Sequence, residues 1–253
     1  MFAESGENRI PGRFKETIVK NLTRRDFVRS SMTAGTAMTA VAASTASSQP
    51  QAVTEGRIKI VALSCSPRKG QGTATSLGVC LEAARQVSDR IDTELIELAD
   101  FRINGNLAAG VTGPERTQDD FPKLAPRLIA PEVRGIIVGT PVYFGGMSSL
   151  CKAFLDRAIL LWQKDFALSN KVAGVLACGG TRNGGQEVTI HAVQVALFCQ
   201  EMILVGNGRP GPRIGATVWS GAEGGVLKDE FSMTTAKALG RRVAEVALRV
   251  NAL

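Results

Sequence analysis

The chain has 253 residues, 44% of them hydrophobic and only 5% aromatic, and this length favours one sizeable α/β domain over two full ones. Its formal net charge is +7, but residues 1–46 hold seven Lys/Arg and four Asp/Glu, a net of +3, which leaves +4 for the rest. The rest has no basic block and no basic-aromatic stripe, so nucleic acid is not an expected partner.

The first residues have the composition of a targeting segment. Arg24 and Arg25 are followed by Phe27 and by the small, weakly apolar run 32–44, which is too short to span a bilayer. A basic segment, a short apolar segment and small residues predict an export signal, so residues 1–46 are interpreted as signal peptide and linker. An Ala-Val-Ala site predicts a mature chain that begins near Ala43.

The Arg-Arg-x-Phe spacing resembles the twin-arginine signal, whose apolar region is milder than that of ordinary secretory signals. The resemblance implies export in the folded state, the twin-arginine machinery as a partner, and a periplasmic or otherwise extracytoplasmic location. The alternative is a disordered basic tail that happens to contain an Arg-Arg pair. No stable membrane span is expected.

Apolar runs that fit strands alternate with helical patterns along residues 57–253, which we interpret as one domain. Such an alternation predicts a parallel, doubly wound α/β sheet of five strands. The expected strands are 57–64, 93–98, 134–140, 172–180 and 201–207, and the expected helices include 73–88, 119–132 with interruptions at Pro122 and Pro126, and 227–250.

The carboxyl edge of such a sheet is where a ligand is expected. For the strand order 2-1-3-4-5, the chain reverses direction between the first and third strands, and ligands bind beyond the strand ends at that point. The loops after these two strands are therefore the first candidates for a binding site.

The loop after the first strand, SCSPRKGQGT, suits a terminal phosphate group. It offers hydroxyls, positive charge and glycines whose backbone amides converge at the start of the following helix. It matches neither GxxxxGK[ST] nor GxGxxG. A plain glycine-rich connection is the alternative for this segment. The candidate phosphate ligands are Ser66, Arg68, Lys69, Gly72 and Thr73.

The loop after the third strand, GTPVYFGGMSSLCKAFLDR at 139–157, is the most specific motif in the chain. Together with SPRKGQGT and GGTRNGGQE (179–187), it resembles the NAD(P)H-dependent FMN reductase family of flavodoxin-like proteins, in particular the branch of iron-sulfur flavoproteins and quinone reductases. The resemblance covers most of residues 58–250. It implies a flavodoxin-like fold and FMN as the cofactor, with NADPH or NADH as a transient substrate.

The same resemblance assigns residues to the two sides of the flavin ring. A flat aromatic cofactor needs close approach of the backbone, which glycine-containing turns permit. For Tyr143 and Phe144, ordinary packing against a neighbouring helix is the alternative. The residues implied are Pro141, Val142, Tyr143, Phe144 and Gly145 on one side and Gly180, Thr181, Gly184 and Gly185 on the other.

The sequence also departs from the family pattern. Gly72 stands where the family usually has Asn, so one polar contact to the phosphate is missing. The compact Cys cluster of the iron-sulfur branch has no counterpart in residues 99–118. The five cysteines are scattered singly and there is one histidine, so neither a metal site nor a disulfide framework is expected.

Two functions follow as expectations. The first is an FMN-dependent oxidoreductase that passes electrons from a reduced nicotinamide, or from another donor, to a quinone, a flavin or a similar acceptor. The second is a non-enzymatic FMN electron carrier of the flavodoxin type, against which the positive charge of residues 47–253 weighs. No side chain is expected to be catalytic, because the flavin carries out the hydride transfer. The resemblance also implies a homo-oligomer.

Overall fold

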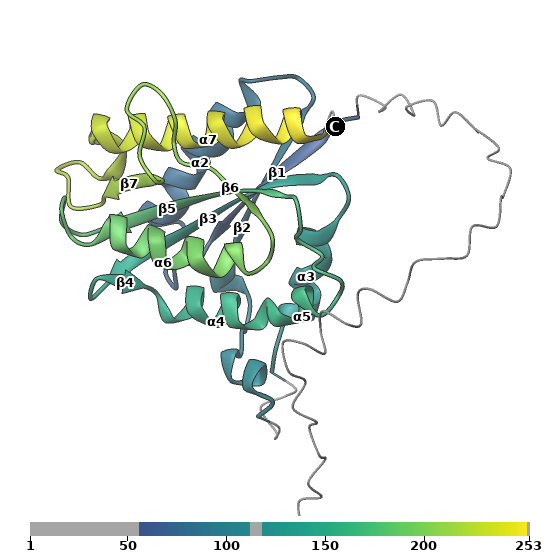
Figure 1. Cartoon of the computed structure of the whole chain (residues 1–253). Helices are drawn as coiled ribbons and strands as arrows, with labels where there is room; N and C mark the ends of the chain where they lie inside the picture. Colours follow the sequence, from purple (N-terminus) through teal and green to yellow (C-terminus); the bar gives the residue numbers. More distant parts are fainter. Residues whose placement is uncertain (1–55, 112–117, 252–253) are drawn as a thin grey trace, which may run out of the picture. The chain divides into compact units, whose positions relative to one another are not determined.

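The protein is described by a computed structural model for residues 56–111 and 118–251. A central sheet is covered by helices on both faces (Figure 1), and its main strands follow the order β2-β1-β3-β5-β6. The four long strands are β1 (Ile58–Ser64), β2 (Ile91–Glu97), β3 (Val133–Tyr143) and β5 (Val172–Gly179), and they pair in parallel. The predicted doubly wound α/β sheet of flavodoxin-like order is therefore confirmed.

The fifth position of the sheet differs from the predicted single strand 201–207. Two short strands occupy it: β6 (Ile203–Leu204) pairs with the beginning of β5, and β7 (Ala216–Trp219) pairs with its end. The intervening chain leaves the sheet and returns to it. A further short strand, β4 (Gly146–Met147), pairs antiparallel with the end of β3, so the sheet has seven strands instead of five.

The helices divide between the two faces of the sheet, each with its own apolar core. One face carries α2 (Gly72–Arg85) and α7 (Glu230–Asn251). The other carries α3 (Phe121–Ile129), α4 (Ser149–Arg157), α5 (Ile159–Trp162) and α6 (Gln186–Phe198) (Figure 1). Short 3-10 turns occupy Leu98–Asp100, Gly105–Ala109 and Val226–Lys228.

Helices α2 and α7 approach each other very closely. A Cβ atom at Gly240 of α7 would lie only 1.9 Å from the carbonyl oxygen of Cys80 in α2. Only glycine permits the two helices to pack this closely.

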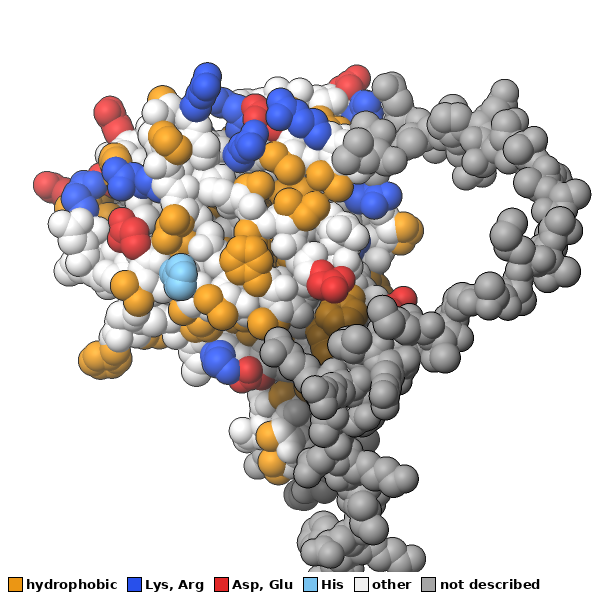
Figure 2. Space-filling view, in the orientation of Figure 1, with side chains coloured by type: hydrophobic (Ala, Val, Ile, Leu, Met, Phe, Trp, Pro, Cys, Tyr) orange, Lys and Arg blue, Asp and Glu red, His pale blue; other side chains and the backbone are white. Residues whose placement is uncertain are grey.

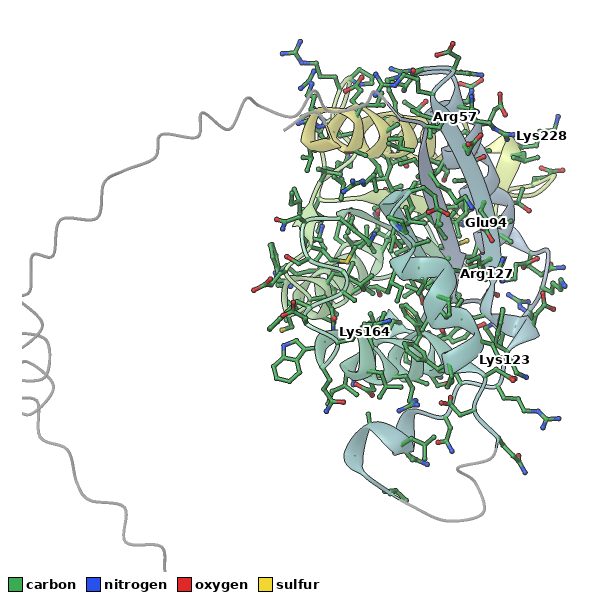
Figure 3. The ribbon with its side chains drawn as sticks, turned by 90° about the vertical axis from the view of Figure 1, so that its right-hand side faces the viewer. Arg57, Glu94, Lys123, Arg127, Lys164 and Lys228 are labelled. Carbon is green, nitrogen blue, oxygen red and sulfur yellow. The ribbon has the colours of Figure 1, made fainter. Side chains whose placement is uncertain are left out.

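Helix α3 corrects the expectation of an interrupted helix. Pro122 lies in its first turn, where a missing N–H costs nothing, and Pro126 lies inside the helix, which continues to Ile129. Its Arg127 pairs at 2.5 Å with Glu94 of the edge strand β2 (Figure 3).

Other charged residues of β2 also form ion pairs. Arg57 pairs with Asp92 at 2.6 Å, and Lys59 with Glu94 at 3.4 Å. Charged side chains on an edge strand oppose pairing with another chain. Within the described residues, no helix has the length and apolar composition needed to cross a membrane.

Candidate functional site

The loop between β1 and α2 leaves the start of α2 open. Gln71 is the N-cap residue, and its side chain makes no capping hydrogen bond. The first helical amides of α2 therefore point outward without a side-chain partner, an arrangement that attracts an anion. Arg68 lies exposed in the same loop. Thr73 is 3% exposed and lies in the first turn, as the sequence predicts.

Hydrogen bonds inside the loop set its shape. The Ser66 hydroxyl accepts from the Arg68 amide at 3.1 Å and donates to the Arg68 carbonyl at 3.0 Å. The tip is held from outside: Lys69 pairs with Asp100 at 2.7 Å, and the Gly70 amide donates to the Glu97 carboxylate at 2.8 Å. The positive charge of Lys69 is thus already matched by a carboxylate, whereas Arg68 has no ion-pair partner among the described residues.

Cys178, at the end of β5, forms the floor beneath this helix start. A Cβ at Gly72 would lie 3.3 Å from the Cys178 sulfur and 3.4 Å from the Ser220 Cβ, so a larger side chain would crowd the floor. Burial raises the pKa of the Cys178 thiol, although the Ser220 and Thr73 hydroxyls and the positive charge of Arg68 oppose that rise. Cys178 therefore stays a neutral thiol near neutral pH.

The loop after β3 is a tight hairpin. Val142 pairs with Met147 and Tyr143 with Gly146, while Phe144 (φ 49°) and Gly145 (φ 76°) form the two-residue turn with positive φ at both positions. Phe144 is fully exposed at the tip and Tyr143 is 41% exposed. The full exposure of Phe144 argues against packing of its ring on a neighbouring helix, and both rings have exposed surface that is available to a ligand.

The beginning of α4 ties this hairpin to β1. The Ser148 hydroxyl donates to the carbonyl of Cys65 at 2.7 Å and accepts from the Cys151 amide at 3.1 Å. The Ser148 amide in turn donates to the Thr140 hydroxyl at 3.1 Å. The ends of the first and third strands are thereby held together, with Pro141 buried beside them.

The loop after β5 meets the hairpin. A Cβ at Gly185 (φ 95°) would come within 3.0 Å of the Gly145 Cα atom, so two glycines mark the contact. Buried Gln186 organises the loop: its amide nitrogen donates to the Thr181 carbonyl at 2.6 Å, and its oxygen accepts from the Gly184 amide at 2.8 Å. This loop, which also contains Gly180, faces the same edge of the sheet as the phosphate-binding candidates.

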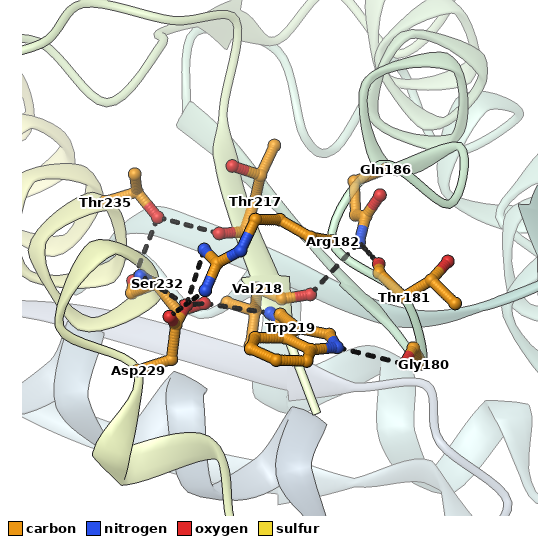
Figure 4. Close-up of polar contacts among 10 residues, drawn as sticks. All are labelled: Gly180, Thr181, Arg182, Gln186, Thr217, Val218, Trp219, Asp229, Ser232 and Thr235. Atoms are coloured by element: carbon orange, nitrogen blue, oxygen red, sulfur yellow. Dashed lines mark hydrogen bonds and ion pairs between the residues drawn. The ribbon is translucent and has the colours of Figure 1, made fainter. Parts of the chain in front are cut away.

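A cluster around Trp219 was missed by sequence reasoning (Figure 4). The Arg182 guanidinium lies 4.5 Å from the centre of the Trp219 ring and pairs with Asp229 at 2.5 Å. The Trp219 indole donates to the Gly180 carbonyl at 3.0 Å. Arg182 lies inside the GGTRNGGQE stretch, and its basic side chain was the only available signal. Trp219 is the last residue of β7, a strand that was not predicted.

Asp229 anchors this cluster to α7. Its carboxylate accepts from the Ser232 hydroxyl and amide as well as from Arg182. Burial opposes its ionisation, but the Arg182 ion pair and the Ser232 hydrogen bonds outweigh burial, so the pKa of Asp229 lies below its usual value. The 180–185 loop is therefore held by three elements: β7, α6 and the start of α7.

The predicted site residues thus lie on three loops that follow β1, β3 and β5 at the carboxyl edge of the sheet. Contacts between Gly145 and Gly185, and between Gly72 and Cys178, join the loops into one surface. An uncapped helix start for an anion lies at one end, and an exposed aromatic hairpin facing a glycine-rich loop lies at the other. These residues fit a flat ligand that carries a phosphate.

A sequence profile of the NADPH-dependent FMN reductase family matches residues 58–210. The chain belongs to this family. It is accordingly an NAD(P)H-dependent oxidoreductase that uses FMN, as the resemblance implied.

Individual relatives agree with this assignment. An iron-sulfur flavoprotein of Methanocaldococcus jannaschii is 36% identical over 192 residues, which cover 75% of this chain and 97% of that protein. An NAD(P)H dehydrogenase (quinone) of Aromatoleum aromaticum is 36% identical over 132 residues, or 46% of this chain and 62% of that protein. The flavodoxin-like WrbA-like protein of Agrobacterium tumefaciens shares the fold, with a TM-score of 0.51 at 21% identity over 77% of this chain and 99% of that one.

The residues of this chain do not fit an iron-sulfur cluster. A cluster needs about four thiolates close together, whereas the five cysteines belong to separate elements, and no group of three metal-ligating side chains occurs in the described ranges. Burial also raises the pKa of the Cys65 thiol and raises that of Cys80 to about 12. The chain thus shares the flavodoxin-like domain of its iron-sulfur relative without the ligands for the metal cluster.

Proposed function

We propose that FMN binds with its phosphate at the beginning of α2 and its ring between the β3–β4 hairpin and the 180–185 loop. The observation that carries this proposal is the uncapped start of α2, with Arg68 as the nearby unpaired cation, at the same edge as the two glycine-containing loops. The phosphate ligands proposed are Arg68, Gly72 and Thr73, with Ser66 and Lys69 shaping the loop around them.

In this arrangement the protein binds, orients and shields the cofactor. Bound FMN supplies the hydride and electron chemistry. Tyr143 and Phe144 offer exposed aromatic surface beside the ring, and the Gly145–Gly185 contact lets the backbone of both loops approach it. The exposed side of this surface remains open to a donor and an acceptor that bind in turn.

We propose a quinone, a flavin or a similar small molecule as the electron acceptor. The quinone-reducing relative supports this choice, and so does the exposed aromatic hairpin, against which a planar acceptor can stack. A flavodoxin-type carrier would bind FMN equally well but would not consume NADH or NADPH with a small quinone in steady state. That assay separates the two functions.

The flavin site is tested by replacing Arg68 with Ala. Loss of a charge-assisted contact worth about 1.5 to 3 kcal/mol should weaken FMN binding by roughly ten- to a hundred-fold, while riboflavin, which lacks the phosphate, should lose far less. Titration of the apoprotein with each flavin measures both constants. Arg85→Ala at the far end of α2 is the matched control, with unchanged affinities expected. Equal losses of FMN and riboflavin affinity for Arg68→Ala would exclude Arg68 from phosphate binding.

We also propose that residues 1–46 direct twin-arginine export, so that residues 57–253 act as an FMN-binding domain outside the cytoplasm. Support comes from the Arg-Arg-x-Phe sequence before a mild apolar run; these residues lie outside the part of the chain that the structure describes. Reduced nicotinamides are not normally supplied in that compartment, so the exported protein would use another electron donor.

A homo-oligomer is proposed as well, to be measured by light scattering of the flavin-loaded protein.

A further inference from the structure

We call the surface formed by the loops after β1, β3 and β5 the flavin surface. A cavity lies away from it, between the chain that follows β6 and one face of α7. It has a volume of about 580 Å³, within the range of small-molecule sites. Figure 2 shows Lys and Arg side chains gathered along the edge of the molecule where α7 runs. The cavity is lined by Asn207, Gly208, Arg209, Pro212, Ala238, Arg241, Arg242, Glu245 and Arg249.

The cavity carries an excess of positive charge. Glu245 is the one acidic lining residue, and its nearest ion-pair partner is Arg242 at 3.8 Å. Arg209, Arg241 and Arg249 are exposed and have no carboxylate within 4.0 Å in the described part of the chain. Three guanidinium groups therefore converge on one concavity without an anionic partner from the protein.

A buried amide faces the same cavity. Asn207 is 2% exposed, and its side-chain oxygen accepts from the Arg213 amide at 2.6 Å. The Asn207 backbone amide donates to the Arg213 carbonyl at 3.2 Å, which closes the loop. The side-chain nitrogen of Asn207 makes no hydrogen bond to any described residue, so it is a donor left for a ligand.

The loop is held against the helix by packing. Gly208 has φ 68°, and a Cβ at this position would lie 3.4 Å from the aliphatic part of Arg242. Ala238, Arg241, Arg242, Glu245 and Arg249 recur at helical spacing on one face of α7. The 22-residue helix α7 thus presents Arg241, Arg242 and Arg249, and the loop that packs on it presents Arg209.

The cavity shares no residue with the flavin surface. Arg241 follows Glu230, the first residue of α7, by eleven positions, which corresponds to about 16 Å along the helix axis. Trp219 and Asp229, which border the flavin surface, meet the beginning of α7. A ligand in the arginine-lined cavity would therefore occupy a separate site on the same helix.

We propose that this cavity binds a phosphorylated small molecule that carries at least two negative charges. Guanidinium groups are planar, permanently charged and matched to phosphate oxygens, and the free Asn207 amide adds a neutral donor. A recessed site formed by a loop and a helix suits a small molecule better than a membrane surface, which a flat or convex basic face would fit.

The test uses the flavin-loaded protein, in which FMN occupies its own phosphate site, and pyrophosphate as the probe at constant ionic strength. Calorimetric titration should give saturable binding. Arg209→Gln and Arg241→Gln should each weaken it roughly ten-fold or more, because each removes a charge-assisted contact. Lys237→Gln is the matched control, since it removes one exposed positive charge from α7 outside the cavity; less than a two-fold change is expected.

Three results would overturn the proposal. They are the absence of saturable pyrophosphate binding, equal weakening by Lys237→Gln and Arg241→Gln, and binding to phosphatidylglycerol vesicles without binding to pyrophosphate. Asn207→Asp provides a second check, because a carboxylate beside the guanidinium groups should abolish pyrophosphate binding if the amide faces the ligand. FMN content, read from the visible spectrum, should stay constant in all variants, which separates this proposal from the assignment of the flavin site.

Discussion

Asp229 holds together the cluster around Trp219 and Arg182. It is 7% exposed, and its carboxylate accepts from Arg182 and from the hydroxyl and amide of Ser232. A buried carboxylate with this many donors is stable only while it is ionised. We therefore expect the contacts that hold the 180–185 loop to weaken when Asp229 is protonated.

Stability should follow the ionisation of Asp229. Its pKa is lowered in the folded protein, so the stabilisation is present above the ordinary pKa near 4 and is lost as the pH falls toward the lower folded value. Asp229→Asn should lower the free energy of unfolding by about 1 to 3 kcal/mol at pH 7 and by less at pH 3. Denaturant unfolding at both values measures this. Asp100→Asn, which breaks an exposed pair with Lys69, is the control and should change little at either pH.

Tyr143 tests whether any side chain takes part in the chemistry. It is 41% exposed next to the fully exposed Phe144. Tyr143→Phe keeps the aromatic face, so turnover should change only modestly and flavin should be retained; Tyr143→Ala should raise KM for quinones more than it lowers FMN content. Steady-state rates and visible spectra measure these effects. A yellow but inactive Tyr143→Phe variant would instead make the hydroxyl a proton donor.

At the scale of elements, the hairpin after β3 and the loop after β5 act as a pair. Neither is long, and their approach depends on Gly145 and Gly185, both with positive φ. A side chain at Gly185 would be strained in its backbone and would push against the Gly145 Cα atom. The separation of the two loops is therefore set by two glycine positions.

Gly185→Ala should displace the two loops from each other. We expect destabilisation of about 1 kcal/mol or more and weaker binding of both FMN and riboflavin, since the ring side of the site is affected and not the phosphate side. Flavin titration and denaturant unfolding measure the two effects. Gly78→Ala in α2, where a Cβ meets open space, is the control and should stabilise the protein by about 0.5 to 1 kcal/mol. Unchanged flavin affinity in Gly185→Ala would show that the loop contact does not shape the site.

At the scale of the whole molecule, the flavin surface and the arginine-lined cavity both border α7. The helix meets Trp219 through the Ser232 hydroxyl at its start, at 2.8 Å, and carries Arg241, Arg242 and Arg249 farther along. The two proposed ligand sites thus lie along different parts of one helix. The proposed export of the whole chain rests on a different segment, residues 1–46, which lie outside the described residues.

Replacing Arg24 and Arg25 together with Lys should strand the precursor in the cytoplasm. The charge is kept while the Arg-Arg pair is lost, so a route that requires that pair should fail and one that requires only positive charge should not. Fractionation followed by immunoblotting measures precursor and mature forms, and flavin content should be unchanged. Normal export of the double variant would refute the twin-arginine route.

Much of the fold follows from local patterns in the sequence. Apolar runs of strand length predicted β1, β3 and β5, because a strand buried on both faces has few polar residues. The edge strand β2 was predicted from the short stretch TELIEL, although several of its residues are charged. The alternation with helices predicted the sheet order and therefore the edge at which the candidate loops meet. Arg68 and the glycines near it were identifiable as candidate phosphate ligands because they are adjacent in the sequence.

Other features depended on residues far apart in the sequence. The fifth strand was divided into β6 and β7 because its pairing depends on where β5 offers free backbone groups, not on its own apolar pattern. Arg182, Trp219 and Asp229 come from three segments, and the arginine-lined cavity joins a loop to a helix some thirty residues later. Local periodicity determined which segments form strands and helices. Only the tertiary structure decided these contacts between distant side chains, because they depend on distances that no local pattern encodes.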